Sequence, residues 1–151
     1  MGVERIEVSG VRKSKDDKGR DVLAAGKSMP SAPTAKTATL RAKADTWLGK
    51  QVRLRGRVSA QCTKRRRWFA IVDDDSGRTM RVLTVPVFLP PRQVVGKQVE
   101  VVGKLERLEL PLKRAQHMAE HHKLTPPDKA SIKGKRVQEL VLRAVSARFF
   151  Q

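Results

Sequence analysis

A short basic and aromatic segment carries the clearest chemical signal in this chain. Four consecutive cations, Lys64 to Arg67, are followed directly by Trp68 and Phe69, two of only six aromatic residues in the sequence. Fixed positive charge beside a flat ring suits a phosphate backbone with exposed bases. The same segment contains Cys62, the only cysteine, so any thiol chemistry must also involve it.

A second group of cations lies on the stretch that precedes this segment. From position 51 the sequence alternates, with apolar residues on one side and arginines on the other. A period of two residues predicts a half-buried strand with its arginines in a row. Arg81, on a later strand, extends the basic surface. The expected nucleic-acid-binding residues are Arg53, Arg55, Arg57, Lys64, Arg65, Arg66, Arg67, Trp68 and Arg81.

The two rings of the segment are weaker candidates than the charges. Trp68 and Phe69 are adjacent on a predicted strand, so they face opposite sides and only one can be exposed. Because the chain has so few aromatic residues to fill a core, a core position is the simpler interpretation for each of the two rings considered alone. We therefore expect phosphate-backbone contacts, to DNA or RNA without sequence preference, rather than base stacking.

Three histidines suggest a metal or haem site as an alternative. His117 and His121 are four residues apart on a predicted helix, with His122 beside them, and Cys62 completes a Cys/His set. No second cysteine or carboxylate stands at ligand spacing, and the neighbouring cations oppose a divalent ion. Histidines near a helix C-terminus also interact favourably with the helix dipole. We expect no cofactor.

The sequence offers no convincing catalytic arrangement. Asp73 to Asp75 resemble a carboxylate cluster, but the following Ser76 and Gly77 predict a hairpin turn. There is no Gly-rich phosphate loop. Cys62 is expected to face inward with Val58, and a buried thiol is a poor nucleophile. We expect a protein that is not an enzyme.

The charge balance points to an acidic partner. There are 33 Lys and Arg against 15 Asp and Glu, a formal net charge of +18. Residues 46–110 alone carry 14 basic and 6 acidic residues, so the excess is not confined to a tail. Nucleic acid is the commonest acidic partner. An acidic protein, with this chain as the basic subunit of a larger assembly, remains the other interpretation, and an anionic membrane surface is a third.

Composition also predicts the compartment. A single cysteine allows no intrachain disulfide, which favours a reducing environment. The first residues lack the long apolar run of a signal peptide, and no stretch reaches the ~20 apolar residues of a membrane span. We expect a cytoplasmic protein with no membrane span.

The patterned elements predict an all-β fold with one inserted helix. Gly56 and Gly103 lie in the middle of the two longest strands, where they allow sharp bends or bulges. Five strands with bent first and fourth members, placed side by side, predict a five-stranded OB-like barrel. The strands are expected over 51–62, 68–72, 79–85, 97–110 and 138–149, and the helix over about 111–124.

The barrel is expected to begin at about residue 46 and to continue to residue 151. Residues 1–45 are expected to form a basic, partly flexible N-terminal segment, with a short strand over 1–11. Within it, 24–43 is rich in Ala, Ser, Thr, Pro and Lys. Its apolar content is too low to offset the entropy of ordering, which predicts a linker that orders only on a partner.

With these strands in place, residues 48–149 resemble a family of small uncharacterised bacterial OB-like proteins, many of them secreted or lipid-anchored. The family pattern is a Gly-Lys-x-Val-x-x-x-Gly strand, a Cys-x4-Cys-Trp motif, an acidic turn, a second Gly-Lys-x-Val strand, and a helix with His-x-Ala-Glu/Asp. The matching positions are Gly49 to Gly56, Cys62 with Trp68, Asp73 to Asp75, Gly96 to Val99, and His117 to Glu120.

The chain departs from this family pattern at two points. Arg67 stands where the resemblance implies a second cysteine, so a disulfide or metal site made by that Cys pair cannot form here. The export signal is also missing. Both departures favour an intracellular variant whose turn carries charge in place of thiol chemistry.

Overall fold

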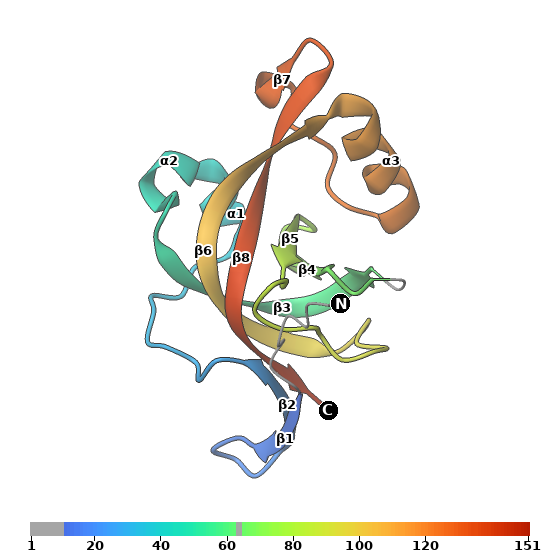
Figure 1. Cartoon of the computed structure of the whole chain (residues 1–151). Coiled ribbons are helices and arrows are strands. Elements are labelled where there is room, and N and C mark those ends of the chain that lie inside the picture. Colours follow the sequence, from blue (N-terminus) through green and yellow to red (C-terminus); the bar gives the residue numbers. More distant parts are fainter. Residues whose placement is uncertain (1–10, 63–64) are drawn as a thin grey trace, which may run out of the picture.

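The structure is a computed structural model that describes residues 11–62 and 65–151. Its main feature is a sheet that closes on itself as a ring of five strands (Figure 1). Around the ring the strands follow in the order β3-β4-β5-β8-β6, and β6 pairs with β3 to close it. The ring strands are β3 Gln51–Gln61, β4 Trp68–Val72, β5 Thr79–Leu83, β6 Gln98–Pro111 and β8 Arg136–Phe150.

Short elements attach to this ring. The longest of them, α3, spans Leu112–His122, close to the helix expected over about 111–124. The fold is therefore all-β with few helices, as the sequence predicts. The remaining elements are β1 Arg12–Lys15, β2 Asp21–Gly26, α1 Thr37–Ala42, α2 Ala44–Trp47, the short 3₁₀ helix η1 Lys129–Ser131, and β7 Ile132–Lys133.

The main hydrophobic core fills the inside of the ring. Along β3, Val52, Leu54 and Val58 are fully buried, as the alternating pattern predicts. Phe69 from β4 packs edge-on against Phe149 from β8, with 5.3 Å between ring centroids. Strands from the middle and the C-terminal end of the sequence thus contribute to one core, and the residues that alternate with these buried ones point outward.

The two mid-strand glycines lie where neighbouring chain passes too closely for a side chain. A Cβ on Gly56 would stand 2.4 Å from Cγ2 of Ile71, and one on Gly103 would stand 2.5 Å from the carbonyl oxygen of Arg143. At Gly103 the register of β6 and β8 also shifts. The predicted side-by-side pairing of the first and fourth ring strands is confirmed by the antiparallel pairing of β3 with β6.

A bulge in β3 lies at Ser59, three residues beyond the glycine that suggested one. The register with β4 steps from Val58 to Ala60, which leaves Ser59 unpaired and reverses the facing of the residues after it. Gln61 consequently points inward, where its side-chain Nε2 donates to the carbonyl oxygen of Pro91 at 2.7 Å. Cys62 faces outward and packs against a smaller outer cluster, so the expectation that it faces inward with Val58 is wrong.

The segment expected as a linker over 24–43 is also different from the prediction. Ala25 at the end of β2 and Leu40 on α1 are both fully buried in the main core. Between them, the backbone of Pro33 and Ala35 hydrogen-bonds to Arg53 and covers the edge of β3 that β4 leaves free. The buried residues of this segment are mostly small, so they produced no apolar periodicity in the sequence. The short strand expected over 1–11 lies almost wholly outside the described residues.

In the described part of the chain, none of the helices has the length and apolar character needed to cross a membrane.

Candidate nucleic-acid interface

Three arginines converge on one buried carboxylate on the outside of the ring. Arg55 on β3, Glu100 on β6 and Arg148 on β8 are directly opposite one another across the three strands. Arg55 Nε lies 2.7 Å from Oε2 of Glu100, and Arg53 Nη1 lies 3.1 Å from the same oxygen. Arg148 binds the other oxygen through Nε at 3.1 Å and also through Nη2. We call Arg53, Arg55, Glu100 and Arg148 the Glu100 cluster.

The carboxylate of this cluster is strongly held in its charged form. Burial alone raises the pKa of Glu100, but hydrogen bonds from Arg148, Arg55 and Arg53 outweigh burial and lower the pKa to about 2. The cluster therefore combines three permanent positive charges with one negative charge at neutral pH. The excess of positive charge remains on the outer surface of the sheet.

The three arginines differ in how freely they meet solvent. The side chain of Arg53 is only 18% exposed, and it is tied to Met29 Sδ and the Pro30 carbonyl oxygen at 3.3 Å each. The side chains of Arg55 and Arg148 are 64% and 37% exposed. Within the described residues, Arg55 uses only its Nε in a hydrogen bond. Arg53 thus anchors the cluster, and Arg55 and Arg148 present donors to the outside.

An open groove of about 710 Å³ runs past these two arginines. One wall is the turn between β1 and β2, and the other is formed by the start of β6 and the end of β8. The ring of Phe150 in this groove is covered by Arg20, whose Cζ lies 5.2 Å from the ring centroid. The groove is lined by more cations than anions: Lys18, Arg20, Arg55, Lys97 and Arg148 against Asp16, Asp17 and Glu100.

Of the remaining basic residues predicted on the β3 row and the following turn, Arg57 and Arg66 are bound to other groups of the chain. Arg57 Nη2 lies 2.9 Å from Asp74 Oδ1. Arg66 has a left-handed φ of 50° and donates through Nη1 to the carbonyl oxygen of Pro90 at 3.2 Å, which fastens the turn to the loop before β6. Arg65 and Arg67 are exposed. Lys64 lies outside the described residues.

Trp68 and Arg81 were predicted to contact nucleic acid, but both are buried beneath α3. The Trp68 ring packs edge-on against His122 of α3, with centroids 5.3 Å apart, and Met118 lies in the same cluster. Arg81 is 6% exposed and forms a two-pronged ion pair with Glu139 at 2.7 and 3.0 Å. Both side chains lie on the outer side of the ring, and the sequence, although it predicted the helix, gave no sign that the helix covers this side.

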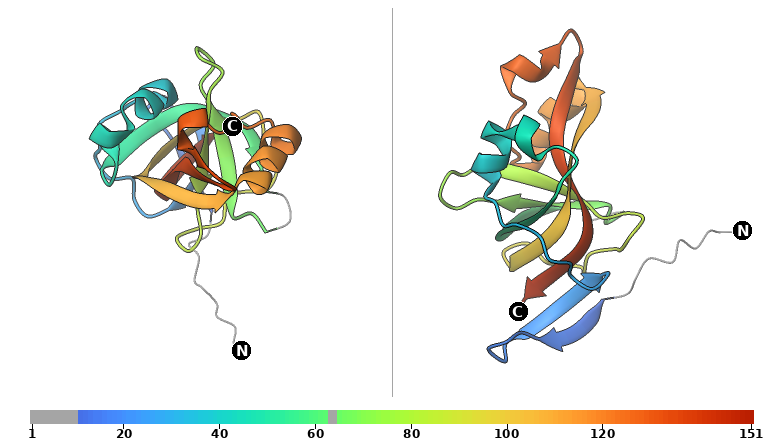
Figure 2. Two further views of the ribbon diagram at one scale, coloured as in Figure 1. Left: turned by 90° about the horizontal axis from the view of Figure 1, so that it is seen from above. Right: turned by 90° about the vertical axis from the view of Figure 1, so that its left-hand side faces the viewer.

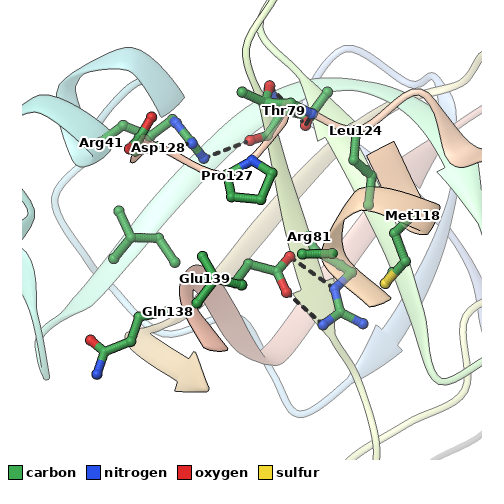
Figure 3. A pocket seen from close by; sticks show the side chains of 13 residues that line it. Arg41, Thr79, Arg81, Met118, Leu124, Pro127, Asp128, Gln138 and Glu139 are labelled. Carbon is green, nitrogen blue, oxygen red and sulfur yellow. Dashed lines mark hydrogen bonds and ion pairs between the residues drawn. The ribbon is translucent and has the colours of Figure 1, made fainter. Parts of the chain in front are cut away.

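A small cavity of about 60 Å³ lies under α3 beside this ion pair (Figure 3). Arg41 reaches its rim from α1 and donates through Nη1 to the carbonyl oxygen of Thr79 at 3.4 Å, while its Nε is buried without a partner. Burial lowers the pKa of Arg41, and the Asp128 carboxylate partly opposes that shift. The space suits about two water molecules and is too small for a nucleotide.

The alternative metal set is not assembled. His117 and His121 stack with centroids 4.2 Å apart on the exposed side of α3. Cys62 packs instead in the outer cluster around Trp68. No group of three or more His, Cys, Asp or Glu side chains in the described ranges 11–62 and 65–151 comes close enough to hold a metal ion.

The sequence did not identify Glu100, Arg148, Arg20 and Lys97 as parts of the site. One signal for Glu100 was present: it is the single acidic residue in the apolar run from Val99 to Val102. A carboxylate at such a buried position must be paired with cations. Its partners follow only from the strand register, which the sequence does not show.

Comparison with known proteins adds no relative: no protein-family model, curated protein or solved structure matches this chain. The resemblance to the bacterial OB-like family therefore stays a prediction.

Proposed function

We propose that this protein is a non-catalytic nucleic-acid-binding protein that contacts phosphates through the outer surface of an OB-like barrel. The ring supports the barrel assignment in two ways. Counted along the chain, the first ring strand, β3, pairs with the second, β4, and with the fourth, β6. The third ring strand, β5, runs parallel to the fifth, β8. This connectivity is the one expected of a five-stranded OB barrel.

The Glu100 cluster is the observation that carries the proposal. Guanidinium groups bind phosphate through paired N–H donors, and fixed geometry lowers the entropy lost on binding. Arg55 and Arg148 are held in place by the same carboxylate, yet both side chains keep donors facing solvent. The groove beside them adds Lys18 and Lys97, while Arg20 is paired with Asp16 at 2.6 Å. A phosphate backbone is the partner that such an arrangement fits best.

The placement of the aromatic residues favours backbone contacts over base stacking. Trp68 and Phe69 are both buried, and Phe150 in the groove has Arg20 over its ring. Binding through phosphates alone carries no sequence preference and depends strongly on salt. We therefore propose a preference for double-stranded over single-stranded nucleic acid, with little dependence on base sequence.

A fluorescence-anisotropy panel tests this function. Labelled single strands, DNA duplexes and RNA duplexes are titrated with the full chain at low ionic strength, with poly-glutamate as a competitor of similar charge. Duplex binding that varies little between unrelated sequences, and that poly-glutamate displaces poorly, is the expected result. An absence of binding to every nucleic acid contradicts the proposal. Displacement by poly-glutamate at equal charge concentration would favour an acidic protein partner instead.

A further inference from the structure

The paired strands β6 and β8 extend well beyond the ring. β3 accompanies β6 only as far as Lys104, and β5 joins β8 only from Val141 onward. The remaining part of the β6–β8 ribbon projects away from the ring, at the end opposite the β1–β2 hairpin (Figure 2, right). The ribbon therefore connects the Glu100 groove with a distant end of the molecule.

The far end of the ribbon is a tight, basic assembly. The short β7 pairs with the beginning of β8, and the backbone N–H of Leu112 donates to the carbonyl oxygen of Lys135 at 2.8 Å. This hydrogen bond joins the start of α3 to the β7–β8 turn. Four exposed cations gather there, and we call them the distal tip: Lys113, Arg114, Lys133 and Lys135.

The charges of the distal tip do not stabilise the fold. Within the described part of the chain, none of the four has an acidic partner within ion-pair distance. Lys113 and Arg114 also occupy the first turn of α3, which contains no acidic residue. The helix dipole disfavours cations at that end. Like charges that lie close together repel one another, and an anionic partner that binds there removes this repulsion.

Between the groove and the distal tip, the outer face of the ribbon carries one further pair of cations. Lys104 on β6 is exposed and stands directly opposite Arg143 on β8, an unfavourable pairing of like charges. Of the two, Arg143 is compensated by Glu106 at 2.9 Å. Since Glu100, Lys104 and Glu106 are spaced by even numbers along β6, they share its outer face. The cations thus extend along this surface from Arg148 to Lys104 and Arg143, and the next paired positions toward the distal tip, Glu106 with Val141 and Leu108 with Glu139, carry no cation.

We infer that one duplex lies along the β6–β8 ribbon and contacts both the Glu100 groove and the distal tip. This inference rests on the proposed function and adds the size class of the ligand. From Glu100 to Pro111 the strand spans at most about 36 Å at 3.3 Å per residue. That length corresponds to about 10 base pairs of B-form DNA. A shorter duplex reaches only one of the two surfaces.

The test compares two double variants of the full chain on two ligands. Lys133→Gln with Lys135→Gln removes two charges from the distal tip. The control, Lys43→Gln with Arg107→Gln, removes two charges near α2, where Arg107 projects from the opposite face of β6 and pairs with Asp45. The ligands are a 24-base-pair DNA duplex and a DNA hairpin with a 6-base-pair stem, about 20 Å long. A 24-base-pair RNA duplex shows whether the two helix forms differ.

The tip variant is expected to bind the 24-base-pair duplex about tenfold more weakly than the control at low salt, with a salt slope lower by about two. On the short hairpin, the tip variant and the control should bind alike. Equal affinity of tip variant and control for the long duplex would overturn the inference while leaving the proposed function intact. The proposed function itself fails if the unaltered protein binds none of the three ligands.

Discussion

Arg55 and Arg148 bind opposite oxygen atoms of one carboxylate, with Arg55 Nε 2.7 Å from Glu100 Oε2 and Arg148 Nε 3.1 Å from Oε1. Their side chains stay partly exposed although Glu100 is 2% exposed. The arrangement fixes two guanidinium groups across three strands of a closed sheet. It also links a property of the fold, its stability at low pH, to a property of the surface, its positive charge.

Glu100→Gln should lower the free energy of unfolding by about 3 kcal/mol at neutral pH. The pKa of Glu100 falls from 4.5 to about 2 in the folded protein. A depressed carboxyl pKa stabilises the fold above the unfolded value and loses this effect as the pH falls toward the folded value. Urea unfolding at about pH 7 and about pH 3 measures both effects. A pH dependence as steep in Glu100→Gln as in the unaltered protein would contradict the account.

Met118→Ala should destabilise the protein by about 2–4 kcal/mol, because it removes the buried contact between α3 and the outer face of β4. His117→Ala, an exposed change on the same helix, serves as the control and should have little effect. Chemical unfolding followed by tryptophan fluorescence gives both values. Similar stability of the two variants would mean that α3 does not cover Trp68.

The thiol of Cys62 should react with iodoacetamide at lower pH than an ordinary cysteine. Burial raises the pKa of Cys62, but hydrogen bonds from the backbone N–H groups of Arg67, Arg65 and Arg66, with the charge of Arg67, lower it below 9.0. The rate of alkylation against pH reports the midpoint, and the urea-unfolded protein is the reference. Arg67→Gln should keep most of the shift, since the backbone donors remain. A folded midpoint at or above the unfolded one would rule out this environment.

Gly56→Ala should destabilise the ring by about 1–3 kcal/mol, because the added methyl group would stand 2.4 Å from Ile71 Cγ2 and 2.8 Å from the carbonyl oxygen of Val72. The exposed Gln51→Ala at the start of the same strand is the matched control. Thermal unfolding monitored by circular dichroism compares the two. Equal melting temperatures of Gly56→Ala and the control would mean that β3 and β4 do not approach each other this closely at Gly56.

Much of the fold follows from local patterns, and the exceptions have identifiable causes. The strand expected over 68–72 is β4, and the remaining ring strands and α3 differ from expectation by about two residues. The bulge at Ser59 was not predicted because it arises from the pairing of β3 with β4, which turns Cys62 outward. The β1–β2 hairpin and α1 were missed because small residues fill several of their buried positions, such as Ala25 in β2 and Thr37 in α1.

The candidate site was only half visible in the sequence. The alternation along β3 identified Arg53 and Arg55 as outward-facing cations, and the side chains of both lie on the outside of the ring. Their convergence with Arg148 on Glu100 depends on the register of three strands that are distant in sequence. The burial of Arg81 depends in the same way on the position of α3, which no local pattern specifies.

The salt dependence of duplex binding by the Arg55→Gln, Arg148→Gln double variant tests the central claim most directly. Glu100 keeps Arg53 as its partner in this variant, so folding is retained, and circular dichroism checks it. The control pairs Arg107→Gln, of similar exposure to Arg148, with Lys43→Gln. We predict that log affinity falls linearly with log salt and that the slope drops by about two in the double variant but not in the control. Equal slopes in the two folded variants, or no duplex binding by the unaltered protein at low salt, would contradict it.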